Sequence, residues 1–128
     1  MRLVVPHMLR KLRWALLWAV VILVLTLMPG NDVPAWSWAE VIHLDKIVHV
    51  GLFSVLTILL GVALTDRSSE KQGSFGPLVL AVLMAVAYGA AIELFQGAMG
   101  IGRTADIMDV MADGAGALLG YAYLRWRS

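Results

Sequence analysis

The sequence alternates between long apolar runs and short polar segments. The apolar runs cover about residues 12–28, 47–65, 77–97 and 105–126. Each is close to the roughly 20 residues that a helix needs to cross a bilayer. Turn-forming residues separate them, such as Pro29 and Gly30 after the first run. The pattern predicts an all-α, integral membrane four-helix bundle that forms one domain over residues 1–128.

The first and fourth apolar runs are less clearly membrane spans than the other two, because charged residues lie before or within them. The first follows four basic residues and resembles a signal peptide, but no small-x-small cleavage site follows it, so we expect an uncleaved anchor. The fourth contains Asp109 and Asp113, and a carboxylate is costly at the centre of a bilayer. Both aspartates lie in its first two turns, near the interface, and Ala112, Gly116 and Gly120 follow the small-xxx-small pattern of helix packing. We therefore interpret this run as a span as well.

The composition agrees with a membrane protein. Of the 128 residues, 60% are hydrophobic and 15% are charged, and the mean hydropathy is +0.80. A soluble domain carries about 25% charged residues, so the composition favours an integral membrane protein over a soluble domain of this size. The chain has no cysteine, which excludes disulfides and thiolate chemistry. A nucleic-acid partner is not expected.

The basic residues predict the orientation of the bundle. The N-terminal tail contains Arg2, Arg10, Lys11 and Arg13, the loop between the second and third runs contains Arg67 and Lys71, and the C-terminus contains Arg125 and Arg127. The two remaining loops contain only Lys46 and Arg103, each beside a carboxylate. The positive-inside rule then places both termini in the cytoplasm.

This topology would bring the polar residues of three helices together at the outer end of the bundle. The predicted ligand-binding residues are Asp45, Lys46, His49, Glu93, Gln96, Arg103, Asp106, Asp109 and Asp113. Helical spacing supports the grouping, because Ala81, Ala85, Gly89 and Glu93 share one face and Asp106, Asp109, Asp113, Gly116 and Gly120 share another. We expect the third and fourth helices to pack closely through these small residues.

Simpler roles remain open for several of these residues. Asp45, Asp106 and Asp109 are also suited to the start of a helix, where capping and the helix dipole favour an acid. His49 alone fits a hydrogen-bonded interior histidine, and Arg103 fits a partner of Asp106. Glu93 and Asp113 lie within apolar helical turns, where an ionisable residue indicates a functional site.

Two chemistries fit the predicted cluster. In the first, Arg103 and Lys46 bind a phosphate or carboxylate while the acids orient the two cations. In the second, a divalent metal is the cofactor, with candidate ligands His49, Glu93, Asp106, Asp109 and Asp113. The candidate catalytic residues are then His49 or Glu93 as general base. The sequence does not decide whether the protein is an enzyme.

The pattern and spacing of these residues resemble those of the VanZ-like family, a family of small bacterial membrane proteins. The resemblance covers about residues 45 to 124 and rests on Asp45-Lys46-x-x-His49, Glu93-x-x-Gln96 and Gly102-Arg103-x-x-Asp106-x-x-Asp109-x-x-x-Asp113-Gly114-x-Gly116-x-x-x-Gly120. One departure is Asp113, where the family pattern leads us to expect asparagine. The family is named for a member linked to resistance to the glycopeptide teicoplanin, and this implies the cell envelope.

The resemblance and the cluster together predict a bacterial inner-membrane protein. Its extracytoplasmic polar site would bind a cell-envelope lipid or lipid-linked precursor and influence glycopeptide susceptibility. One alternative is a metal-assisted hydrolase or transferase acting on a lipid-linked phosphate. Another is an assembly factor that docks onto a second copy of itself or a partner membrane protein through its small-residue faces.

Overall fold

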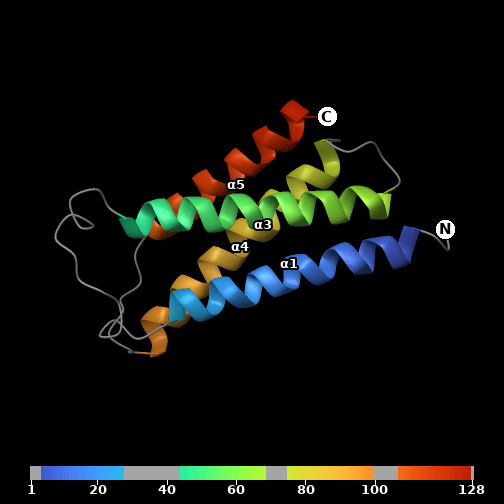
Figure 1. Ribbon diagram of the computed structural model, residues 1–128. Coiled ribbons are helices and arrows are strands. Elements are labelled where there is room, and N and C mark those ends of the chain that lie inside the picture. The colour runs from blue at the N-terminus through green and yellow to red at the C-terminus, as the bar shows by residue number, and fades with distance from the viewer. Residues whose placement is uncertain (1–3, 28–43, 69–74, 100–106, 128) are drawn as a thin grey trace.

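The computed structural model describes residues 4–27, 44–68, 75–99 and 107–127, all of them helical. The described residues form four helices, which are α1 (Val4–Leu27), α3 (Leu44–Ser68), α4 (Phe75–Met99) and α5 (Ile107–Arg127) (Figure 1). Pro77 lies in the first turn of α4, where its missing N–H costs no helical hydrogen bond. Over the described residues the predicted all-α fold is confirmed, and the described part of each predicted run falls on one helix.

Two of the helices are long and apolar enough to cross a membrane. The segments are Lys46–Thr65 in α3 and Phe75–Ala98 in α4. The basic residues near the start of α1 and the aspartates of α5 make those helices less uniformly apolar. Membrane crossing by α1 and α5, and the cytoplasmic placement of both termini, therefore stay predictions.

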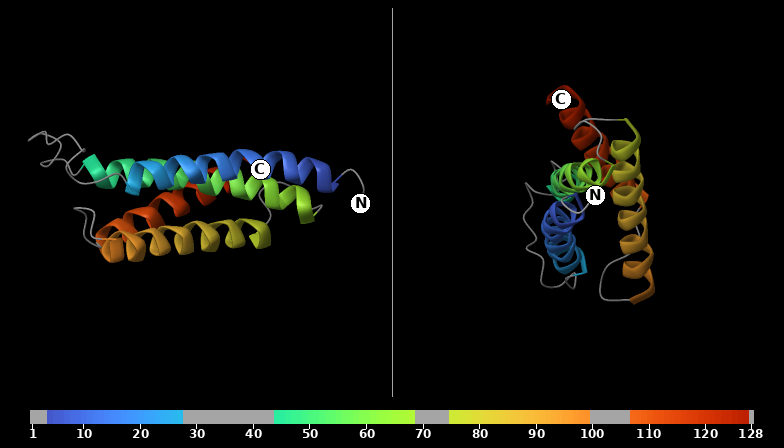
Figure 2. Two further views of the ribbon diagram at one scale, coloured as in Figure 1. Left: turned by 90° about the horizontal axis from the view of Figure 1, so that it is seen from below. Right: turned by 90° about the vertical axis from the view of Figure 1, so that its right-hand side faces the viewer.

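Successive helices run in opposite directions, so their ends form two groups (Figure 1). At one end of the bundle α1 and α4 end while α3 and α5 begin. α3 makes the most extensive contacts, with α1 and α5 both packed against it and α4 alongside, as the views in Figure 2 also show. The segments that supply most of the polar residues therefore meet at the end where α3 and α5 begin.

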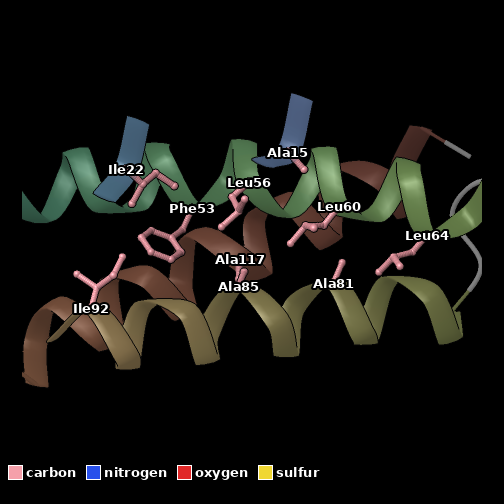
Figure 3. Close-up of a cluster of buried hydrophobic side chains, with 10 residues drawn as sticks. All are labelled: Ala15, Ile22, Phe53, Leu56, Leu60, Leu64, Ala81, Ala85, Ile92 and Ala117. Atoms are coloured by element: carbon pink, nitrogen blue, oxygen red, sulfur yellow. The ribbon is translucent and has the colours of Figure 1, made fainter. Parts of the chain in front are cut away.

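The core between the helices is apolar and closely packed. Ile22 of α1, Phe53 of α3 and Ile92 of α4 are buried in it, and Ala85 and Ala117 are fully buried where α4 and α5 meet (Figure 3). Large apolar side chains are also exposed on the outside of every helix. A soluble protein rarely exposes so much apolar surface, so these outer faces suit contact with lipid chains.

Side-chain hydrogen bonds attach α1 to its neighbours. Trp18 Nε1 donates to the backbone oxygen of Leu52 on α3 at 2.9 Å. From α4, Tyr88 donates its hydroxyl to the backbone oxygen of Ala19 at 2.5 Å, and Gln96 donates to the backbone oxygen of Thr26. Such bonds hold α1 in register, because in a membrane a buried polar group must find its partner within the protein.

The small residues of α5 pack on a different helix from the one we predicted. A Cβ atom at Gly116 would lie 3.0 Å from the backbone carbon atoms of Val50 and closer still to its oxygen, and a Cβ at Gly120 would lie 2.7 Å from the backbone oxygen of Ser54. Both contacts are with α3. The prediction that these glycines pack against α4 is wrong, because the face of α5 that carries them turns toward α3.

The α3–α5 contact makes a testable prediction about stability. Gly116→Ala should destabilise the bundle by about 1–3 kcal/mol, the usual cost of overpacking, because the new methyl group meets the rigid backbone of α3. Gly114→Ala is the matched control on the same helix, since a Cβ there has nothing within 4 Å. Thermal unfolding in detergent measures both, and equal melting temperatures would contradict the packing.

Candidate functional site

Five ionisable side chains converge at the end of the bundle where α3 and α5 begin. Lys46 and His49 come from the first two turns of α3, Glu93 from the last turns of α4, and Asp109 and Asp113 from the first two turns of α5. We call these five residues the polar cluster. The antiparallel order of the helices places them together, although up to 67 positions separate them in the sequence (46 to 113).

The centre of the polar cluster is a pair formed by His49 and Asp113. The Nδ1 atom of His49 lies 2.6 Å from Oδ1 of Asp113, and both side chains are buried. When Asp113 is ionised and His49 is neutral, this hydrogen bond places the imidazole proton on Nδ1 and leaves the lone pair on Nε2. The ring of Phe53, one turn along α3, lies nearly parallel to the imidazole, with centroids 6.4 Å apart. The orientation of His49 is thus fixed on two sides.

A glycine on α4 makes room for the Asp113 carboxylate. A Cβ atom at Gly89 would lie 3.0 Å from Cγ of Asp113 and closer still to Oδ2. Any larger residue at this position would push the carboxylate away from His49. Gly89 is buried, and the face of α4 that carries it packs against Asp113 of α5.

Lys46 and Asp109 form the more accessible half of the polar cluster. The Nζ atom of Lys46 lies 2.6 Å from Oδ1 of Asp109, and the two side chains are 25% and 13% exposed. The other oxygen of Asp109, Oδ2, lies 4.0 Å from Nε2 of His49. Asp109 thus lies between the more exposed Lys46 and the buried His49, which is more than helix capping alone requires.

Glu93 completes the polar cluster from α4. Its side chain is buried, and one of its oxygens lies within 4.8 Å of a donor atom of both His49 and Asp109. These three residues come from three different helices. An imidazole and two carboxylates at this separation form a donor set that a divalent cation can bind.

The remaining predicted site residues have different outcomes. Gln96 is buried, but its amide group donates to α1, so its observed contact joins two helices. The side chain of Asp45, together with Arg103 and Asp106, lies outside the described residues. Whether those three belong to the site stays a prediction.

Two further residues, Phe53 and Ser54, shape the site and were not predicted from the sequence. Phe53 follows His49 by four positions, a spacing that places both on one helical face, and this could have identified it. Ser54 donates its hydroxyl to the backbone oxygens of both Val50 and Gly116, at 2.8 and 2.9 Å. Because a serine in an apolar helix usually bonds only to its own helix, the sequence carried no signal for the second contact.

Comparisons with known proteins place the chain in a family context. The family model described as VanZ/LLP1 matches residues 12–127, which is most of the chain and includes all five residues of the polar cluster. No curated protein and no solved structure matches the chain.

Proposed function

This chain belongs to the VanZ/LLP1 family, and on that premise we propose that its polar cluster binds the anionic head group of a cell-envelope lipid or lipid-linked precursor. Family membership fits a membrane protein linked to glycopeptide resistance. The proposal further places the protein in the bacterial inner membrane, with the polar cluster on the extracytoplasmic side. Lipid chains would contact the exposed apolar faces of the helices.

The observation that carries this proposal is the position of Lys46 in an otherwise apolar bundle. It is a cation near the end of a helix, one quarter exposed, and held by a partly buried carboxylate. A lysine at this depth can extend its ammonium group toward the interface, where lipid phosphates lie. The bond to Asp109 orients Lys46 before the ligand arrives and so reduces the entropy lost on binding.

The acids of the polar cluster have supporting roles in this proposal. Asp109 orients Lys46, and Asp113 orients His49. The predicted second cation, Arg103, would add a bidentate contact to the same phosphate. Binding of an envelope lipid or its precursor would then change how much of that molecule glycopeptides can reach, and this would link the site to susceptibility.

The proposal predicts that removing the charge of Lys46 weakens binding of a lipid phosphate. We expect Lys46→Gln to raise the Kd for a polyprenyl phosphate in nanodiscs about 10–150-fold, because a charge-assisted hydrogen bond contributes about 1.5–3 kcal/mol. Lys46→Arg should retain most of the affinity.

Two controls make this binding measurement specific. Lys11→Gln removes a lysine of α1 at the opposite end of the bundle and should leave the Kd unchanged. A neutral polyprenol of the same length separates binding of the phosphate from binding of the chain. Equal affinity of the wild-type protein for the phosphate and the alcohol would refute head-group recognition.

A further inference from the structure

His49, Glu93 and Asp109 surround one point at the outer part of the polar cluster. Each offers one donor atom, and these three atoms lie within 4.8 Å of one another. We propose that they bind a divalent transition-metal ion, Zn²⁺ or Mn²⁺, with Asp113 as a positioning residue. This inference deepens the proposed function and rests on it in one respect. The ion would act beside Lys46 as a second positive group that binds the phosphate of the lipid head group.

The orientation of His49 points to a ligand. Its Nδ1 is bound to Asp113, and Nε2, which carries the lone pair when the ring is neutral, lies near Oδ2 of Asp109. Nε2 makes no hydrogen bond to any described residue, and its separation of 4.0 Å from Asp109 is too long for one. The side chain is only 8% exposed. A cation shared with Asp109 and Glu93 would give this nitrogen a partner.

The carboxylate–histidine arrangement is the one that metal sites use. A metal-bound histidine usually donates its other N–H to a carboxylate, which fixes the ring and makes the ligand nitrogen more basic. Asp113 is placed for that role, because it bonds to Nδ1 while Nε2 lies 4.0 Å from Asp109. Phe53 and Gly89 restrict the movement of His49 and Asp113, respectively.

The distances suit an ion of this size. Metal–ligand bonds of about 2.1 Å place two ligand atoms roughly 3.0–4.2 Å apart, depending on the angle at the metal. The 4.0 Å separation of Nε2 and Oδ2 lies inside this interval, and the limit of 4.8 Å on the other separations exceeds its upper end by roughly half an ångström. A small rotation of the Glu93 carboxylate would close that difference.

The chemistry of the donors selects the metal. Mg²⁺ and Ca²⁺ take oxygen ligands, whereas imidazole favours Zn²⁺ and its neighbours, and two carboxylates also suit Mn²⁺. Two ionised carboxylates would balance the charge of the ion, and Lys46 offsets part of the charge of Asp109 through its other oxygen. Three protein ligands leave a coordination position open, and a phosphate oxygen could occupy it.

The metal site is tested without any lipid. Protein stripped with a chelator is titrated with Zn²⁺, Mn²⁺, Mg²⁺ or Ca²⁺ by equilibrium dialysis. We expect one Zn²⁺ or Mn²⁺ per chain, with binding lost in His49→Gln, Glu93→Gln and Asp109→Asn and weakened about 10–100-fold in Asp113→Asn. His7→Gln and Asp66→Asn, which alter the same residue types at the opposite end of the bundle, should bind as the wild type does.

A spectroscopic measurement on the wild-type protein guards against variants that fail to fold. Bound Mn²⁺ should show coupling to one imidazole nitrogen in pulsed EPR, and His7→Gln should retain this coupling. No saturable binding up to millimolar metal, or binding that Glu93→Gln and Asp109→Asn leave unchanged, would overturn the inference.

The lipid titration distinguishes this inference from the proposed function. Lipid-phosphate binding that depends on Lys46 and is unaffected by the chelator would overturn the metal site as part of lipid recognition. One metal ion bound through the three ligands, without any affinity for lipid phosphate, would support the metal site and refute the proposed function.

Discussion

Asp113→Leu should destabilise the protein more than any other single change in the polar cluster. The carboxylate is buried on α5 and bonds to His49 at 2.6 Å, so its removal leaves the imidazole N–H buried without an acceptor. Breaking a buried pair costs about 3–5 kcal/mol in soluble proteins, whereas deletions in transmembrane bundles cost less than about 2. We expect an intermediate loss of about 2–3 kcal/mol in the free energy of unfolding.

Asp113→Asn is the matched control for this prediction. Its amide oxygen can still accept the proton of Nδ1, so the loss should stay below about 1 kcal/mol. Reversible unfolding in mixed micelles compares the two variants with the wild type. If the leucine and asparagine variants unfolded together with the wild type, His49 would not depend on Asp113 for its position.

The largest effect on function is expected from the double variant Glu93→Gln and Asp109→Asn. It keeps side-chain volumes nearly constant but removes the negative charges of Glu93 and Asp109 beside His49 and weakens the bond that orients Lys46. We expect the glycopeptide susceptibility of a host that expresses this variant to match that of a host that lacks the gene. The measurement is the minimal inhibitory concentration of teicoplanin at equal levels of protein in the membrane.

Asp66→Asn provides the control for the double variant. It removes an acid near the end of α3, at the other end of the bundle, and should leave susceptibility at the wild-type value. If the double variant behaved like the wild type at equal protein level, the polar cluster would have no part in the envelope phenotype.

The sequence was sufficient to predict the helices and the place where their polar residues meet. Apolar runs defined the four helices to within a few residues except at the N-terminus, where α1 begins at Val4 and includes basic residues that we placed before the span. The convergence of Lys46, His49, Glu93 and Asp109 followed from helix order alone, because successive antiparallel helices place their ends alternately. Both results rest on local pattern and connectivity, which a single sequence contains.

The contacts within the bundle could not be predicted in the same way. Gly116 and Gly120 defined a face of α5 that permits close packing, but two helices could meet that face, and only the three-dimensional arrangement selects α3. Likewise, the acids at 109 and 113 share a helical face, yet one bonds to Lys46 and the other to His49. Such choices depend on how each helix is rotated about its axis, which spacing along one chain does not determine.

Head-group recognition by the polar cluster is tested most directly by photocross-linking. A polyprenyl phosphate that carries a photoreactive group next to the phosphate is incorporated into nanodiscs with the wild-type protein, and cross-linked residues are mapped by mass spectrometry. We predict that the cross-links fall near Lys46, Glu93 and Asp109 and that unlabelled polyprenyl phosphate displaces them. Cross-links spread equally over both ends of the bundle, or not displaced by the unlabelled lipid, would contradict the proposal.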